Sequence, residues 1–498
     1  MNVALLLEMA AEAFPDRIAF GGRSDGVSFS ALLARARAGA AWLARQPGRT
    51  TVFLGLNGEA VPTALFASAL AGRAFAPLNY RLPDADLRKL AARTAPSVLI
   101  ADDDMIARLG EIEGVALVSR SAFEAACARG GEPVQADVDE ADIAILLFTS
   151  GTTGEPKAAV LRHEKLFSYV IGSVDLGGAE DGEAALVSVP PYHIAGMSAI
   201  LTGVYAARRT VYLSAFTPEQ WSDAAAREEI TQAMVVPTML DRILDDLERK
   251  GERLPRLASL SYGGGRMPRM TIERALNWLP HVGFVNAYGL TETSSTIAIL
   301  GPDDHRAALT ARDDAERRRL SSVGKPLPSV DLEVRDADGR VVAAGEAGEI
   351  FVRGPQVAGE YLHKNALSDD GWFGTNDAGW IDEEGYLFVE GRLDDVIVRG
   401  GENISPGEIE DVLRQHPHVA DVAVIGLPDD KWGERIAAVI APAAVAGEAT
   451  ELADWVRSRL KSTKTPETWD FRDALPYNET GKLLRRVLRD ELTRSAGA

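Results

Sequence analysis

The hydrophobic positions in the first 300 residues alternate between two patterns. In segments 28–46 and 60–74, apolar residues recur every three to four positions, as they do on one face of an α-helix. Short, continuous apolar runs lie between such segments and predict buried strands. The expected strands are 51–56, 184–189, 210–215, 233–238 and 283–289. Helices and strands that alternate in this way predict α/β layers with largely parallel sheets.

The pattern changes between about residues 320 and 390. Polar and apolar residues alternate along 330–342 and 348–354, and Asp338-Gly339 offers a tight turn. This combination predicts an antiparallel β region.

The chain after residue 395 mixes both kinds of element. Ser405 and Glu408 are spaced as a capping box that opens a helix. A strand is expected at 418–426 and another helix at 451–461.

These patterns predict an α/β protein with two domains. The first is a large N-terminal domain (1–391) of layered α/β subdomains with an added β region. The second is a small, mobile α+β C-terminal domain (392–498). A chain of 498 residues is long enough for two or more domains.

Composition narrows the range of partners. The formal net charge of −20 argues against a nucleic-acid partner, which needs a basic face. The single cysteine, Cys127, excludes an internal disulfide and lies in an expected helix, where we expect it to be inert. The amino terminus reads as a surface-docking helix and no apolar run reaches membrane-spanning length. We therefore expect a cytoplasmic protein that is not inserted in a membrane.

The stretch TSGTTGEPK (149–157) is the first candidate for chemistry. It follows the apolar strand 144–149, and its glycines, hydroxyls and lysine suit a phosphate group. It is not a Walker loop, because only two residues separate Gly151 from Gly154 and Pro156 precedes Lys157.

Further motifs follow in a fixed order along the chain. They are PPYHIAG (190–196), SYGGGRMP (261–268), NAYGLTET (286–293), GWFGTNDAGW (371–380), GRLDDVIVRGGENISPGEIE (391–410) and LPYNETGKLLR (475–485). With the loop at 149–157, this series resembles the adenylate-forming superfamily of acyl-CoA synthetases, luciferases and amino-acid adenylation domains. The resemblance extends over nearly the whole chain.

The resemblance implies a two-step reaction. A carboxylate attacks the α-phosphate of ATP and releases pyrophosphate, and the acyl-adenylate then passes its acyl group to a thiol, usually that of coenzyme A. Because two anions meet in the first step, stabilisation by positive charge should be the largest catalytic contribution. The implied cofactors are ATP, Mg²⁺ and coenzyme A, and members of the family are often dimers.

The resemblance also implies a nucleotide site. The phosphate loop would use Thr149, Ser150, Gly151, Thr152, Thr153, Gly154 and Lys157, and the adenosine side would use Gly264, Gly265, Asn286, Ala287, Tyr288, Gly289, Asp377 and Arg392. Tyr288 would stack on adenine, Thr291 would bind the α-phosphate, and Glu292 would hold Mg²⁺. The family usually has Thr-Gly-Asp where this chain has Thr375-Asn376-Asp377, and asparagine tolerates the positive φ that such a turn requires.

Three further roles are implied for the C-terminal part. Lys482 would reach the carboxylate and α-phosphate during adenylation. Asp394 would be the hinge about which the small domain rotates. After that rotation Gly400 and Gly401 would face the active site and let the pantetheine arm of coenzyme A pass close to the backbone.

The acid pocket is expected from His193, Ile194, Gly196, Tyr262, Gly263 and Gly264. His193 either lies near the reacting carboxyl group or is a hydrogen-bonded structural histidine. No aspartate lies within 190–199, where amino-acid adenylation domains place one, so an amino acid is disfavoured. We expect a bulky or extended hydrophobic acid, with a dicarboxylic acid as the alternative if Arg266 pairs with a second carboxylate.

The sequence leaves two alternatives to acyl-CoA synthesis to consider. The enzyme could form the adenylate and pass the acyl group to a carrier protein or a partner enzyme instead of coenzyme A. A nucleotide-binding module that has lost ligation is disfavoured by the presence of Lys157, Glu292, Asp377, Arg392 and Lys482.

Overall fold

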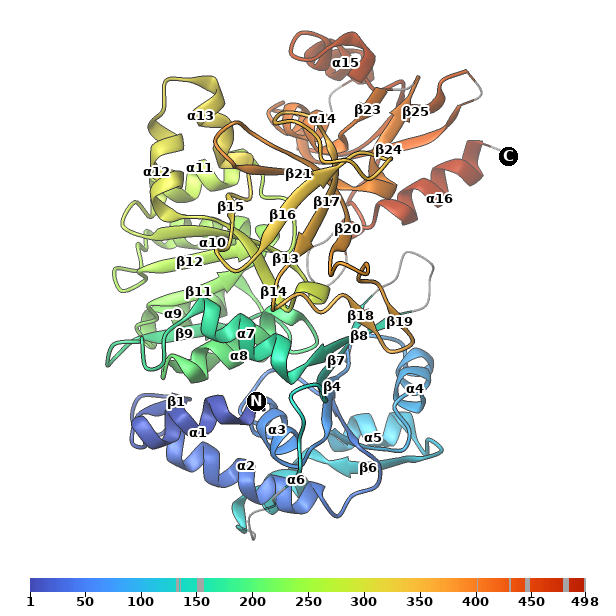
Figure 1. Cartoon of the computed structure of the whole chain (residues 1–498). Coiled ribbons are helices and arrows are strands. Elements are labelled where there is room, and N and C mark those ends of the chain that lie inside the picture. Colours follow the sequence, from blue (N-terminus) through green and yellow to red (C-terminus); the bar gives the residue numbers. More distant parts are fainter. Residues whose placement is uncertain are drawn as a thin grey trace.

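The computed structural model arranges the chain around four β-sheets (Figure 1). The structure describes residues 1–130, 134, 136–149, 156–400, 402–429, 431–443, 448–477 and 483–496. The sheets contain eight, nine, four and five strands.

The eight-stranded sheet has the order β19-β18-β8-β7-β4-β3-β5-β6. Its strands are β3 (Thr50–Leu54), β4 (Ala74–Pro77), β5 (Ser97–Ala101), β6 (Val115–Ser119), β7 (Ile143–Thr149), β8 (Lys157–Arg162), β18 (Glu360–Tyr361) and β19 (Lys364–Asn365). The run from β6 to β7 is parallel, and β8 returns antiparallel to β7. The helices of this part are α1 (Ala4–Ala13), α2 (Phe29–Leu43), α3 (Ala60–Leu70), α4 (Asp84–Ala92), α5 (Asp103–Leu109) and α6 (Arg120–Ala128).

The nine-stranded sheet has the order β15-β14-β13-β12-β11-β9-β10-β1-β2. Its strands are β1 (Ile18–Phe20), β2 (Val27–Ser28), β9 (Ala184–Val187), β10 (Arg209–Tyr212), β11 (Gln232–Val235), β12 (Ser259–Gly263), β13 (Gly283–Leu290), β14 (Ser295–Leu300) and β15 (Lys325–Pro326). Strands β1 and β9 to β13 are parallel, as the alternating pattern predicts. The accompanying helices are α7 (His163–Ser173), α8 (Ile194–Tyr205), α9 (Pro218–Arg227), α10 (Pro237–Lys250), α11 (Arg269–Trp278), α12 (Pro302–Thr310) and α13 (Asp314–Arg318), with 3₁₀ turns η1 (Thr291–Thr293) and η2 (Arg319–Ser321).

The four-stranded sheet is antiparallel throughout, which confirms the predicted β region. It consists of β16 (Asp331–Arg335), β17 (Gly348–Arg353), β20 (Phe373–Ile381) and β21 (Leu387–Arg392). The 3₁₀ turn η3 (Leu393–Asp395) follows directly and leads to the last part of the chain.

The last part of the chain has its own sheet and its own core. Its elements are β22 (Ile397–Arg399), β23 (Glu402–Ile404), α14 (Pro406–Arg414), β24 (Val419–Asp429), β25 (Gly433–Pro442), α15 (Ala449–Arg457), η4 (Ser462–Lys464), β26 (Thr468–Phe471) and α16 (Arg485–Ala496). A cluster of buried aliphatic side chains, including Ile409 and Val424, fills the space between α14, α15 and this sheet. The predicted fold class, a large N-terminal α/β part with a small C-terminal α+β domain, is confirmed (Figure 1).

Two local predictions were wrong. The helix expected over 60–74 ends at Leu70, and Gly72, with φ of 63°, turns the chain into the buried strand β4. The predicted capping box does not form, although α14 does begin at Pro406. The Ser405 hydroxyl donates instead to the backbone oxygen of Glu390 (3.1 Å), while Glu408 pairs with Lys464.

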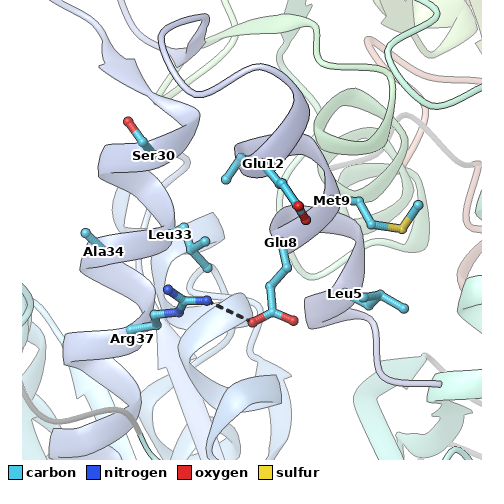
Figure 2. A pocket seen from close by; sticks show the side chains of 9 residues that line it. Leu5, Glu8, Met9, Glu12, Ser30, Leu33, Ala34 and Arg37 are labelled. Atoms are coloured by element: carbon cyan, nitrogen blue, oxygen red, sulfur yellow. Dashed lines mark hydrogen bonds and ion pairs between the residues drawn. The ribbon is translucent and has the colours of Figure 1, made fainter.

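The first helix packs on the large domain as the sequence suggests. Helix α1 buries Leu6 and Leu7 against the core, and α1 and α2 border a surface groove of about 550 Å³ (Figure 2). The Glu8–Arg37 ion pair (3.2 Å) closes one end of the groove, and none of the predicted site residues lines it. Among the described residues, no helix has both the length and the apolar character needed to cross a membrane.

Burial keeps two titratable groups of this core in their neutral forms. Burial raises the pKa of the Cys127 thiol to about 12, so the thiol stays protonated, as expected of an inert cysteine. Burial also lowers the pKa of His163 to about 4, and its Nδ1 atom accepts a hydrogen bond from the Val3 amide (3.2 Å).

We therefore predict that His163 makes the protein acid-sensitive. Between pH 6.5 and about 4 the unfolded chain binds a proton at His163 that the folded chain excludes, so stability falls as pH falls and is unaffected above this range. From pH 7 to pH 5, the loss from this group should be about 2 kcal/mol. In urea unfolding, His163→Asn, which keeps an acceptor for the Val3 amide, should lose less stability over this pH range. An exposed-site control, His363→Asn, should behave like the unsubstituted chain, and equal losses in all three proteins would contradict the assignment.

Candidate active site

Several of the predicted site residues lie at the carboxyl edge of the nine-stranded sheet. The parallel strands β9 and β12 lead toward His193 and Gly264, and Tyr288 lies near the carboxyl end of β13. In open α/β sheets, ligands bind where the carboxyl ends of parallel strands meet. The topology therefore brings three motifs that lie far apart in the sequence to one edge.

Two glycines at this edge are required by close packing of backbone. A Cβ atom on Gly263 would lie 2.3 Å from the backbone oxygen of Ala287, and one on Gly289 would lie 1.9 Å from that of Ser295. At Gly289 the β13–β14 register shifts, which lets the chain turn into η1. Gly289 thus places Thr291 and Glu292 beyond the strand end.

Tyr288, Asp377 and Arg392 form one hydrogen-bonded group. The Tyr288 hydroxyl donates to Asp377 Oδ2 (2.6 Å), and Arg392 Nε contacts Asp377 Oδ1 (3.1 Å). Asp377 and Arg392 are cross-strand partners on β20 and β21, and Arg392 also donates to the Thr375 backbone oxygen (2.8 Å). Burial, and then the Asp377 charge, raises the pKa of Tyr288 well above its usual value, so its hydroxyl remains a donor.

The departure from the family turn is accommodated as expected. Asn376 has φ of 58°, a left-handed conformation that asparagine tolerates, and its backbone amide donates to Glu349 Oε1 (3.1 Å). Its side chain donates to Asp394 Oδ2 (3.4 Å), and Arg489 of α16 donates to the Asp394 backbone oxygen (3.3 Å). The predicted hinge residue therefore contacts both the four-stranded sheet and the last helix.

A second group surrounds Glu292. Its buried carboxylate accepts a hydrogen bond from the Tyr361 hydroxyl (2.6 Å), and its backbone oxygen accepts from the amides of Ala358 and Gly359 (2.8 and 2.9 Å). The Lys157 ammonium lies 5.7 Å from the centre of the Tyr361 ring. Burial and then the Glu292 charge raise the pKa of Tyr361. Because Glu292 follows Tyr288 by four residues at the end of β13, the two groups adjoin.

Several predicted residues lie outside the described part of the chain. These are Ser150, Gly151, Thr152, Thr153, Gly154, Gly401 and Lys482. The residues that flank the phosphate loop are described: Thr149 and Lys157 pair across β7 and β8. Tyr477 and Leu483, which flank the segment that contains Lys482, pair with each other.

The acid-pocket candidates divide into two sets. Tyr192 packs between Tyr80 and His193, with ring centres 5.6 and 4.6 Å away, so an aromatic cluster stands at the end of β9. Tyr262 instead points into the hydrophobic core, where its hydroxyl bonds to His305 Nε2 (2.8 Å). Ile194 and Gly196 lie in the first turn of α8, and a Cβ on Gly196 would meet the Pro190 backbone oxygen at 2.6 Å.

Other predicted residues have structural partners. Asn286 donates to the Ser322 backbone oxygen (2.9 Å) and is buried. Gly400 has φ of 58° and its amide donates to the Trp432 backbone oxygen (2.8 Å). Arg266, considered for a second substrate carboxylate, forms an ion pair with Asp411 of α14 instead.

Sequence reasoning missed Tyr361. It lies in the two-residue strand β18, which joins the eight-stranded sheet through a single pairing with Ala159. Neither periodicity nor a motif distinguishes so short a strand. Only its position beside Glu292 and Lys157 identifies it as part of the site.

Comparison with known proteins gives a consistent result. The family described as AMP-binding enzyme matches residues 7–362, and its C-terminal domain matches residues 408–482. The chain is 33% identical over 464 residues to the indoleacetate–CoA ligase of Aromatoleum aromaticum, covering 89% of this chain and 88% of that protein. It is 33% identical over 462 residues to a fatty acid–[acyl-carrier-protein] ligase of Streptomyces coeruleorubidus, covering 89% and 87%.

A solved structure is similar over almost the whole chain. It is the O-succinylbenzoate coenzyme A synthetase of Bacillus subtilis in complex with ATP and magnesium ion. The identity is 30%, the TM-score is 0.85, and the match covers 97% of this chain and 99% of that one.

We predict that Tyr288 and Arg392 depend on the same carboxylate. Asp377→Ala should destabilise the large domain by about 2 kcal/mol, because it leaves a buried phenol and a guanidinium without their acceptor. The double variant with Tyr288→Phe should cost about 1 kcal/mol less than the sum of the two single variants. Urea unfolding monitored by fluorescence measures all three, and strictly additive losses would show that the contacts are independent.

Proposed function

The chain belongs to the AMP-binding enzyme family, and we propose that it activates a carboxylic acid with ATP and transfers the acyl group to coenzyme A. In the first step a carboxylate oxygen bonds to the α-phosphorus of ATP and pyrophosphate leaves. In the second step the thiol sulfur bonds to the acyl carbon and AMP leaves.

One observation carries the proposal. The Tyr288–Asp377–Arg392 group and the Glu292–Tyr361–Lys157 group adjoin at the carboxyl edge of the nine-stranded sheet. The first offers an aromatic ring and a carboxylate to a nucleoside. The second offers a hard oxygen ligand and a cation to its phosphates. The two groups thus offer the kinds of contact that the adenosine and the triphosphate of ATP need.

The roles proposed for the residues rest on these contacts and on the resemblance to the family. Tyr288 stacks on adenine, Asp377 with Arg392 binds the ribose hydroxyls, Thr291 binds the α-phosphate, and Lys157 binds the terminal phosphates. The Glu292 carboxylate fits Mg²⁺, which prefers oxygen ligands and here would neutralise phosphate charge. The Tyr361 hydroxyl orients that carboxylate through its 2.6 Å hydrogen bond.

Lys482 is proposed to supply positive charge where the carboxylate meets the α-phosphate. Preorganised positive charge at the point where two anions react is usually the largest catalytic contribution. Because this lysine is needed only in the first step, the proposal includes a rotation of the small domain (392–498) about Asp394. The rotation would withdraw Lys482 and bring Gly400 and Gly401 to the site.

We propose an aromatic or arylalkanoic acid as the substrate class. The Tyr80–Tyr192–His193 cluster offers ring edges and faces at the end of β9, and flat aromatic ligands pack well in such arrangements. Arg266 is paired with Asp411, which weakens the case for a dicarboxylic acid bound by that residue. The similar proteins named above for indoleacetate and O-succinylbenzoate support an aromatic acid.

The alternative acceptor is the thiol of an acyl-carrier protein. The similar Streptomyces ligase, which is named for such a carrier protein, supports this alternative acceptor. Both acceptors share the adenylation step, so they differ only in what approaches the site during thioester formation. A dimer, common in the family, is a further proposal.

Pyrophosphate release with ATP, Mg²⁺ and a panel of acids tests the proposal. The panel should contain arylacetic, cinnamic, benzoic, medium-chain fatty and amino acids, each with and without coenzyme A, and mass spectrometry should identify the products. We expect the largest kcat/KM with an aryl acid and acyl-CoA as the product. An acyl-adenylate that persists with coenzyme A, and is consumed by a carrier protein, would favour the alternative acceptor. No acid-dependent pyrophosphate release would refute adenylation.

We predict that Lys482→Ala separates the two half-reactions. Acid-dependent pyrophosphate release should fall by about 100-fold or more, because the charge at the reacting phosphate is lost. Formation of acyl-CoA from supplied acyl-adenylate should change less than about threefold, since the lysine has left the site by then. Lys461→Ala, an exposed lysine on the same domain, is the matched control. Equal loss in both half-reactions would contradict the rotation.

A further inference from the structure

A cluster of two histidines and a glutamate lies on the small domain. His416 and His418 flank Pro417 in the turn between α14 and β24, and Glu451 lies in the first turn of α15. One ligand atom from each residue lies within 4.8 Å of the other two. None of the three belongs to the candidate active site.

Each imidazole lies near one oxygen of the carboxylate. His416 Nε2 is 3.4 Å from Glu451 Oε1, and His418 Nδ1 is 3.4 Å from Glu451 Oε2. His418 Nδ1 is inaccessible to solvent and makes no hydrogen bond to the part of the chain that the structure describes. A buried ring nitrogen that faces a carboxylate without such a bond is unusual in a folded protein.

The nitrogen–oxygen separations are of the size found in a metal site. Ligand atoms about 2.0–2.2 Å from a tetrahedral cation are about 3.3–3.6 Å apart. Both nitrogen–oxygen distances are 3.4 Å, and they end on different oxygens of Glu451. The three ligand atoms lie within 4.8 Å of one another, so binding through one carboxylate oxygen would draw the side chains closer together.

We propose that His416, His418 and Glu451 form a binding site for a first-row divalent cation such as Zn²⁺. Imidazole and carboxylate ligands are a common set for Zn²⁺, and two histidines with one carboxylate leave a fourth position for water. The Glu451 side chain is 47% exposed, so that position opens to solvent and gives the cation an entry path.

The surrounding structure holds the ligands in place. His416 is 4% exposed and packs edge-on against Trp455, with ring centres 4.8 Å apart. The Trp455 indole donates to the Val412 backbone oxygen (2.9 Å), which fixes this ring against α14. The backbone oxygens of His416 and His418 accept from the amides of Val419 and Ala443 (both 3.0 Å).

Binding at His416 requires one proton to move. The His418 amide donates to His416 Nδ1 (3.3 Å), so the neutral ring carries its proton on Nε2, facing Glu451. Coordination through Nε2 shifts that proton to Nδ1 and gives up this long hydrogen bond. The site therefore binds the cation more weakly than one whose imidazole is already in the correct tautomer.

The site would tie the end of α14 to α15. The same helix carries Asp411, which pairs with Arg266 of the large domain. A bound cation thus braces the helix through which the small domain contacts the large one. This role does not depend on the proposed reaction.

Cobalt and zinc titrations of the metal-free full chain test the proposal. Without nucleotide, Co²⁺ should bind at one site with the visible absorption bands of tetrahedral coordination, and Zn²⁺ should displace it. His418→Gln and Glu451→Gln should each weaken Zn²⁺ binding, measured by calorimetry, by about 100-fold or more. His281→Gln, a histidine of the large domain that bonds to the Leu254 backbone oxygen (3.2 Å), is the matched control and should bind like the unsubstituted chain.

The outcomes separate this site from other metal binding. Both substituted residues are partly exposed, so we expect the variants to fold, and circular dichroism is the measurement that checks this. If the variants bind Zn²⁺ as tightly as the unsubstituted chain, or if the cobalt spectrum is octahedral and unchanged by the substitutions, the proposal is wrong. Loss of Zn²⁺ binding in a Glu292→Gln variant alone would assign the cation to the active site and equally overturn it.

Discussion

The carboxylate of Asp377 is the interaction on which the arrangement of the site depends. It accepts the Tyr288 hydroxyl from the nine-stranded sheet and pairs with Arg392 at the end of the four-stranded sheet. Directly after Arg392 the chain enters the turn η3, which leads to the small domain. One buried charge therefore fixes the proposed nucleoside side of the site and the point from which the small domain departs. Because a buried carboxylate is costly unless it is fully paired, both partners are needed for the fold as well as for the proposed binding of ATP.

The third sheet reaches the same place through Tyr361. Its hydroxyl on Glu292 and its ring beneath Lys157 join the short strand β18 to the end of β13. The candidate phosphate side thus depends on the eight-stranded sheet, and the nucleoside side on the other two. The residues of a candidate site assembled from three sheets are correctly placed only when all three sheets are packed together.

The sequence predicted the elements that have a strong pattern and missed those that depend on tertiary partners. Long amphipathic helices and buried strands identified the layers, and the ordered motifs supplied most residues of the candidate site. The capping box at Ser405 does not form because the Ser405 hydroxyl donates instead to the Glu390 backbone oxygen, in the four-stranded sheet. Tyr262 followed its motif but points into the core, since side chains on a strand alternate between faces and this one faces His305. Tyr361 carried no local signal at all.

The ion pair between Arg266 and Asp411 is exposed to the ions of the surrounding solution. Both side chains are partly exposed, at 35% and 24%, so dissolved ions reach them. A Cβ on Gly407 would collide with the Arg266 guanidinium, so the arginine lies flat against α14 where no side chain intervenes. Mobile counterions screen such a pair over a Debye length of about 8 Å at physiological ionic strength. The strength of this contact between the large domain and α14 therefore depends on the salt concentration around the protein as well as on the sequence.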